Sequence, residues 1–196
     1  MLEVSNVFYK EVNNLITINP AFNADVAFVG DSDFWCWKNT VNYQNFVKGL
    51  NSVNLGISGS RAYDWLNYVD VLIKPFNPKK IVLNLGYNDV HHGFDGDGAF
   101  NNLKKLILLI RLRFPNAKLY INSICHLEGN DRLTEEVIFN ALLKSYVVTL
   151  SNAVYIDIND AFKGYVVNDF LLPNDVHYNE DGYKKFAKHL LSFIKN

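Results

Sequence analysis

The stretch VAFVGDSDFWCW, from Val26 to Trp37, decides the fold of this chain. It begins with four apolar residues, and such a run of β-branched and aromatic side chains indicates a strand buried on both faces. Gly30 ends the run, and a helix-like pattern follows within a few residues. Ser32 is therefore predicted at the carboxyl end of a strand, where open parallel α/β sheets bind ligands. It can be a nucleophile if a base reaches it, or Asp31 and Ser32 can simply cap the next helix.

Composition bounds the classes of protein that this chain can be. The sequence has 196 residues, 49% of them hydrophobic, and a net charge of −1. This predicts one domain over residues 1–196 and gives no reason to expect a nucleic-acid partner. Two distant cysteines, Cys36 and Cys125, favour a reducing compartment over a disulfide framework. The N-terminus lacks the pattern of a signal peptide and no run is long enough to span a bilayer, so we expect a cytoplasmic protein without stable membrane insertion.

Apolar strand-like runs alternate with amphipathic helical patterns along the whole chain. This alternation predicts an α/β fold with a doubly wound, five-stranded parallel sheet. The expected strands are 26–29, 53–55, 80–85, 118–124 and 154–158, and the expected helices are 2–15, 37–50, 60–72, 100–114, 133–150 and 181–194.

Polar and glycine-containing turns follow the predicted strands, and another polar loop precedes the last helix. Right-handed crossovers place the carboxyl ends of all strands on one edge of the sheet, so we expect these segments to converge there. Acyl transfer needs a hydroxyl nucleophile, a base, and hydrogen-bond donors for the developing oxyanion. The segments that supply these groups are Gly30-Asp31-Ser32, Asn54-Leu55-Gly56, Gly86-Tyr87-Asn88-Asp89 and Asn174-Asp175-Val176-His177.

In this order and at these separations, the segments resemble the GDSL/SGNH family of serine esterases and acylhydrolases. The last block continues as His177-Tyr178-Asn179 with Gly182-Tyr183, and the similarity covers residues 26–183. The resemblance implies Ser32 as nucleophile, His177 as base, and an oxyanion hole formed by the Ser32 N–H, the Gly56 N–H and the Asn88 side chain. It also implies a three-layer, flavodoxin-like fold without a cofactor.

The same resemblance implies an activity. We expect hydrolysis of carboxylic esters through an acyl-enzyme on Ser32, of the lipase/acylhydrolase or the carbohydrate-esterase type. The substrate would be a small-molecule, lipid or sugar ester. The alternative is a non-catalytic or weakly active binding or regulatory protein on the same fold.

Two positions depart from the family pattern. Asp33 stands where the family has a hydrophobic residue, and its carboxylate could tune specificity or simply be solvated. The family places its acid three residues before the histidine, where this chain has Asn174, while Asp175 lies two before. We expect Asp175 to orient His177, because a shifted loop costs less than losing the charge that stabilises the imidazolium. Asn174 is the alternative third member.

Other polar and aromatic residues have ordinary as well as functional interpretations. His91 and His92 could line the substrate cleft or be exposed, and with Asp95 and Asp97 they could suggest a metal site, although no spacing is diagnostic and we predict none. His126 could shape the acyl pocket and His189 is expected to be structural. Three tryptophans near the blocks could line a pocket or pack in the core: Trp35, Trp37 and Trp65. The nucleophile-elbow and dinucleotide-binding motifs are absent from the sequence.

Overall fold

The computed structural model describes residues 8–173 and 175–195. Its sheet has five parallel strands in the order β2-β1-β3-β4-β5, which confirms the predicted doubly wound α/β architecture. Because the order reverses direction after β2, β1 and β3 are neighbours at the middle of the sheet. The strands are β1 Val26–Gly30, β2 Ser52–Asn54, β3 Lys80–Asn84, β4 Lys118–Asn122 and β5 Ala153–Ile156.

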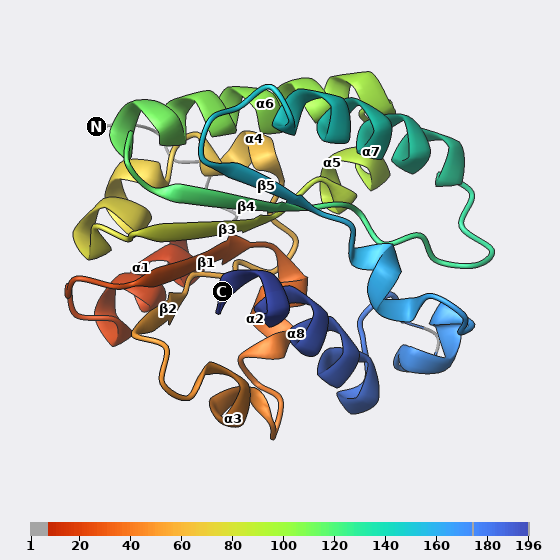
Figure 1. The fold of residues 1–196 in the computed structure, drawn as a ribbon, viewed down its shortest axis with the longest axis horizontal. Coiled ribbons are helices and arrows are strands. Elements are labelled where there is room, and N and C mark those ends of the chain that lie inside the picture. Colours follow the sequence, from red (N-terminus) through yellow and green to blue (C-terminus); the bar gives the residue numbers. More distant parts are fainter. Residues whose placement is uncertain (1–7, 174, 196) are drawn as a thin grey trace.

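Helices cover both faces of the sheet and give three layers (Figure 1). Helices α4, α6 and α7 lie over one face, and α2, α3 and α8 lie over the other. The α-helices are α1 Tyr9–Ile18, α2 Ser32–Trp37, α3 Tyr43–Val47, α4 Ala62–Trp65, α5 Tyr87–His91, α6 Gly96–Arg113, α7 Leu133–Val147 and α8 Glu180–Ile194. Shorter turns of other helix types are η1 Val69–Ile73, η2 Lys74–Phe76, η3 Ile158–Phe162 and η4 Val167–Phe170.

The short helices differ most from the sequence prediction. The predicted helix 37–50 is two helices, α2 and α3, and the predicted helix 60–72 is α4 followed by η1. Helix α5 has no counterpart among the predicted helices, and α6 begins four residues before the predicted helix 100–114. Helices of four to six residues are unstable alone, so packing rather than local sequence pattern decides where they begin and end. Of the predicted leading helix, residues 2–7 lie outside the described residues, and α1 continues to Ile18.

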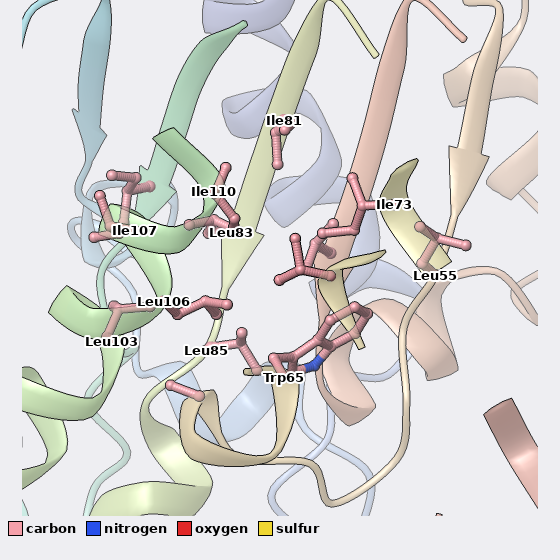
Figure 2. Packing of buried hydrophobic residues seen from close by; sticks show 14 of the residues in the cluster. Leu55, Trp65, Ile73, Ile81, Leu83, Leu85, Leu103, Leu106, Ile107 and Ile110 are labelled. Atoms are coloured by element: carbon pink, nitrogen blue, oxygen red, sulfur yellow. The ribbon is translucent and has the colours of Figure 1, made fainter. Parts of the chain in front are cut away.

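One face of the sheet is packed with aliphatic side chains. Figure 2 shows side chains of α6 and of the β3 segment directed toward one another, with Trp65 of α4 beside them. All of these are buried, and burial of such side chains contributes about 1.5–3 kcal/mol each. The labelled set is Leu103, Leu106, Ile107 and Ile110 from α6, Ile81, Leu83 and Leu85 from the β3 segment, and Leu55, Trp65 and Ile73.

The opposite face is packed with aromatic rings. Trp37 of α2 is fully buried and meets Phe28 of β1 edge to face at a centroid distance of 5.2 Å. Phe186 of α8 lies 6.1 Å from the Phe34 ring of α2. These contacts confirm the core interpretation for Trp37, and they fix α2, whose first residue is Ser32, against β1 and α8.

The register of the strands brings polar residues together at one edge. Gly30 at the end of β1 pairs with Asn84 at the end of β3, and Leu83 pairs with Ile121 of β4. The next residues along, Asn84 and Asn122, are therefore neighbours at the carboxyl ends of their strands. None of the helices in the described part of the chain combines the length and apolar character needed to cross a membrane.

Candidate active site

The turn after β1 holds Ser32 with its polar groups free. Asp31 is the N-cap of α2, and its carboxylate accepts a hydrogen bond from the Asp33 N–H at 3.1 Å. Ser32 is the first residue of α2. Within the described residues, neither its N–H nor its hydroxyl has a hydrogen-bond partner. The helix-cap interpretation therefore holds for Asp31 and leaves Ser32 available for another role.

Two asparagines at strand ends hold this turn in place through a chain of hydrogen bonds. The Asn84 amide donates to Asp33 Oδ2 at 3.2 Å and to Asp31 Oδ1 at 3.4 Å. The Asn122 amide in turn donates to Asn84 Oδ1 at 2.8 Å. This chain of bonds runs across the ends of β1, β3 and β4, so it fixes both carboxyl groups relative to the sheet. Burial raises the pKa of Asp31 well above its usual value, and the nearby Asp33 raises it further.

A cavity of about 30 Å³ lies at this edge and is open to solvent. Its lining combines Ser32 and His177 with polar groups from three strand ends and with apolar side chains. The lining residues are Asp31, Ser32, Asp33, Asn84, Leu85, Tyr87, Ser123, Ile124, Cys125, Leu127, Ile158, Val176, His177 and Tyr178. The structure thus brings the predicted nucleophile and the predicted base to one cavity.

His177 is paired with the acid expected from the sequence. Its ring Nδ1 lies 2.7 Å from Asp175 Oδ1, and the same oxygen accepts the backbone N–H of Val176 at 2.7 Å. Burial alone would raise the pKa of Asp175, but hydrogen bonds from Val176 and His177 hold it below its usual value. The His177 Nε2 atom has no partner among the described residues. Asn174, the alternative acid position, lies outside the described residues.

Backbone pairing holds the His177 loop in place. Leu171 and Tyr178 form an antiparallel bridge, and the Leu172 N–H donates to the His177 carbonyl at 2.9 Å. Asn179 then caps α8, with its side-chain oxygen accepting from the Gly182 N–H at 2.9 Å. The loop therefore begins and ends at fixed points, although Asp175 itself is exposed.

Asn88 lies on α5 beside the loop that follows β2. Its amide donates to the Ser60 carbonyl at 3.1 Å, and its side chain is buried. The neighbouring Asp89 accepts from the Ala62 N–H at 2.7 Å and from the Asn102 amide at 3.2 Å. Burial raises the pKa of Asp89 to about 6. These bonds connect α5 with the β2 loop that carries the predicted glycine donor.

Within that loop, Gly56 and Gly59 differ in the state of their N–H groups. The Gly56 N–H donates to Asn54 Oδ1 at 2.9 Å, and a Cβ at Gly56 would lie 2.5 Å from the Trp35 nitrogen. Gly56 thus allows the loop to pack closely on α2. Gly59 has a φ of 71°, is exposed, and its N–H has no partner among the described residues. The role predicted for the Gly56 N–H would require its bond to Asn54 to open.

A buried glutamate joins two of the histidines. Glu136 of α7 is fully buried, and its two carboxylate oxygens lie 3.0 Å from His91 Nε2 and 3.0 Å from His126 Nδ1. The His91 ring also stacks on Tyr87, a lining residue of the cavity, at a centroid distance of 4.1 Å. Glu136 therefore holds two imidazole rings, and the ring of His91 supports Tyr87 in the wall of the cavity.

The other singled-out polar residues have structural partners. His92 Nδ1 bonds the Asn88 carbonyl at 2.9 Å, and Asp95 caps α6 through the Gly98 N–H at 2.8 Å. His189 Nε2 lies 2.9 Å from the Asp157 carbonyl. In the described ranges there is no group of three or more histidine, cysteine, aspartate or glutamate residues suited to a metal ion. Burial raises the pKa of the Cys125 thiol to about 12, which leaves this cavity residue protonated at neutral pH.

Three side chains of this region were missed by the sequence analysis. Asn84 and Asn122 are the last residues of two otherwise largely apolar strands. This equivalent position indicates a polar role at the edge of the sheet and can be recognised from the sequence. Glu136 gave no such signal, because it lies in an acidic first turn that looks like ordinary N-terminal helix charge.

Several solved structures share this fold. A GDSL-like lipase from Bacteroides thetaiotaomicron matches with a TM-score of 0.74 and 16% identity, over 96% of this chain and 97% of the lipase. A variant of an acetyl-xylooligosaccharide esterase from Geobacillus matches with a TM-score of 0.72 and 18% identity, over 90% of this chain and 96% of that chain. A carbohydrate esterase of family 3 from Talaromyces cellulolyticus matches with a TM-score of 0.68 and 20% identity, over 87% and 97% of the two chains. The fold is thus that of the SGNH/GDSL hydrolases.

Sequence comparison then places the chain in a family. The model of the GDSL-like Lipase/Acylhydrolase family matches residues 27–185, and the chain belongs to that family. A multidomain esterase from Ruminococcus flavefaciens is 32% identical over 133 residues, which are 63% of this chain and 16% of that esterase. This chain therefore corresponds to a small part of that relative. The family and this relative are both named for the hydrolysis of ester bonds.

Proposed function

We propose that this protein is a serine esterase in which Ser32 is the nucleophile and His177 the general base. The observation that carries the proposal is the shared cavity. Ser32, with a free hydroxyl, and His177, with Nδ1 bound to Asp175, line the same space. The bond to Asp175 leaves Nε2 as the ring atom that can accept the serine proton.

The reaction would follow from these positions in two steps. Ser32 Oγ attacks the ester carbonyl while His177 Nε2 takes its proton, and the alcohol then leaves with that proton. Water attacks the acyl-enzyme with His177 again as base, which regenerates Ser32 and releases the acid. Asp175 fixes the imidazole tautomer and balances the positive charge on the ring during both steps.

In this proposal, donors for the oxyanion come from three segments. We assign the Ser32 N–H, the Asn88 side chain and one N–H from the β2 loop to this role. Gly56 was predicted to supply the loop donor. The Gly59 N–H supports the assignment better, because it is unpaired while the Gly56 N–H is bound to Asn54. Gly59 also adjoins Ser60, whose carbonyl accepts from Asn88 and whose hydroxyl lies 3.4 Å from the Gly30 carbonyl.

The dimensions of the site favour a short acyl group and a polar alcohol. A volume of about 30 Å³ has room for roughly two or three water-sized groups, which matches an acetyl group. A second, larger hollow of about 290 Å³ shares Tyr87, Leu127 and Val176 with the first. Its other lining is mostly polar, including Glu128, Asn130, Asp131 and Asn168. We propose acetyl or similar short esters of polyhydroxylated alcohols, since the Geobacillus protein is named an acetyl-xylooligosaccharide esterase and the Talaromyces protein a carbohydrate esterase.

A turnover assay combined with covalent labelling tests the proposal. The purified protein should hydrolyse p-nitrophenyl acetate faster than the butyrate and octanoate esters, and a fluorophosphonate should label it once. Ser32→Ala should abolish labelling and lower kcat by several orders of magnitude. Absence of both turnover and labelling in the wild type would instead support the binding-protein alternative. Turnover that survives Ser32→Ala would assign the nucleophile elsewhere.

A further inference from the structure

We propose that Asp33 is a positioning residue for His177, a second carboxylate that stabilises the imidazolium from inside the cavity. This inference rests on the proposed function, because the imidazolium forms when His177 accepts the Ser32 proton. Asp33 directly follows Ser32 in the sequence. Its carboxylate has no role in the proposed arrangement of Ser32, His177 and Asp175.

The position of Asp33 supports this role. Asp33 and His177 line the same cavity, the first from α2 and the second from the loop before α8. The Asp33 backbone is fixed by its N–H bond to Asp31, and its Oδ2 accepts from the Asn84 amide at 3.2 Å. Burial raises the pKa of Asp33, and the Asn84 hydrogen bond and the positive charge of His177 partly offset that rise. Because these bonds already fix Asp33, little conformational entropy is lost when its carboxylate interacts with the His177 ring.

Because Asp175 is exposed, a second carboxylate can add to the stabilisation of the imidazolium. The Asp175 side chain is 39% exposed and the His177 side chain 25%. Water partly screens the charge of Asp175 in such an exposed pair. Asp33 lines the same cavity as His177 and is less exposed than Asp175, so its charge acts through a lower dielectric constant.

Two neighbouring carboxyl groups cannot both ionise easily, so it matters which of Asp31 and Asp33 carries the negative charge. Asp31 is 3% exposed, and its pKa is raised by burial and also by Asp33. His177 is a cationic partner of Asp33. Among the described residues that shift the pKa of Asp31, none is cationic. We therefore assign the proton to Asp31 and the negative charge to Asp33.

The other titratable groups around Asp33 are thiols and phenols that remain neutral near pH 7. Burial is the first cause of a raised pKa for each of them. They come from α2, α5, α8 and the segments after β4 and before α8: Cys36, Tyr87, Tyr183, Cys125 and Tyr178. None of these five can carry a positive charge, so Asp31, His177 and Asp175 are the ionisable groups that a change at Asp33 would affect.

The test is the pH dependence of kcat/KM for p-nitrophenyl acetate in wild type and Asp33→Asn. Asn keeps the shape and the polar contacts but removes the charge. An Asp33 carboxylate favours imidazolium, so its loss should move the acid limb of the profile to lower pH by about one unit. The kcat plateau should fall about tenfold, the factor that corresponds to one pKa unit. Asp97→Asn, an exposed change of equal charge on α6, should leave both limb and plateau unchanged.

Two further measurements keep the result decisive. Asp33→Glu retains the charge and should restore the acid limb to within a few tenths of a unit of wild type. Proton NMR titration of the His177 ring in Ser32→Ala, with and without Asp33→Asn, should show the same downward shift without any turnover. An unchanged limb and an unchanged ring pKa in Asp33→Asn would overturn the inference while leaving the esterase proposal intact. Activity that survives Ser32→Ala would remove the esterase proposal first.

Discussion

The two halves of the site are built in opposite ways. Ser32 sits on a turn whose neighbours are buried and joined by the Asn84–Asn122 hydrogen bonds across three strands. His177 and Asp175 sit on an exposed loop that is fixed at its two ends by backbone pairing. The Ser32 half is therefore part of the sheet edge, whereas the His177 half is a loop attached to the sheet at its two ends.

This difference predicts that stability and activity separate between the halves. Changes in the sheet-borne half should affect the free energy of unfolding as well as catalysis, because buried polar groups lose partners there. Changes on the loop should affect catalysis alone, because exposed substitutions usually alter stability by about 0.5 kcal/mol or less.

The largest expected effect concerns Asp175. Asp175→Ala should lower kcat by about 10³–10⁴, since His177 loses both its tautomer constraint and its counter-charge. Urea unfolding should give a free energy within about 0.5 kcal/mol of wild type. Asn174→Ala should do much less to kcat. If the ranking inverts, Asn174 orients the ring, and Asn174→Asp should then raise activity. Equal mild losses at both positions would indicate a Ser-His dyad without either side chain.

Asn88 should show the coupled behaviour of the buried half. Asn88→Ala is expected to lower kcat by about 10²–10³ through loss of an oxyanion donor. It should also lower the free energy of unfolding by about 1 kcal/mol, because the bond to Ser60 is lost. The exposed Asn101→Ala on α6 is the matched control for both readouts. A raised KM with an unchanged kcat would assign Asn88 to ground-state binding instead.

The buried half should also give the protein a characteristic pH dependence. The pKa of Asp89 is about 6 in the folded state, above its ordinary value of 3.8, so the folded protein binds this proton more tightly than the unfolded chain. The free energy of unfolding should therefore fall as pH rises from about 4 to 6, by on the order of 3 kcal/mol. Asp89→Asn should flatten that part of the curve in urea titrations, whereas Asp97→Asn should not. A parallel curve for Asp89→Asn would show that another group supplies the slope.

The smallest expected signal distinguishes the two loop glycines. In protein labelled with ¹⁵N-glycine, formation of the phosphonate adduct should move the Gly59 amide proton downfield, because it gains an acceptor. The Gly56 amide proton should move little, since its bond to Asn54 is already formed. A large shift at Gly56 with none at Gly59 would restore the assignment based on sequence. Gly56→Ala should separately destabilise the fold by about 1–3 kcal/mol, because its Cβ meets the α2 backbone.

The sequence was most informative where burial dominates. The apolar runs of β1, β3 and β4 predicted the strands and the edge where Ser32 and His177 line one cavity. The breaks between α2 and α3 were not predictable, because aromatic contacts of Trp37 with Phe28 and Tyr43, formed only in the folded protein, position these short helices. Nor could the sequence tell which N–H groups of residues 55–60 are already paired, since Gly56 and Gly59 differ only in their three-dimensional partners.

The bridge between Leu171 and Tyr178 also determines where this protein can change during evolution. Leu171 and Tyr178 close a ring that carries the proposed base His177 and its acid Asp175. Insertions outside the ring, in the exposed turn at residues 163–166, add only a slowly growing entropy cost and leave the ring intact. Insertions inside it shift His177 relative to Ser32. Length variation among close homologues should therefore accumulate before the bridge and stop at it.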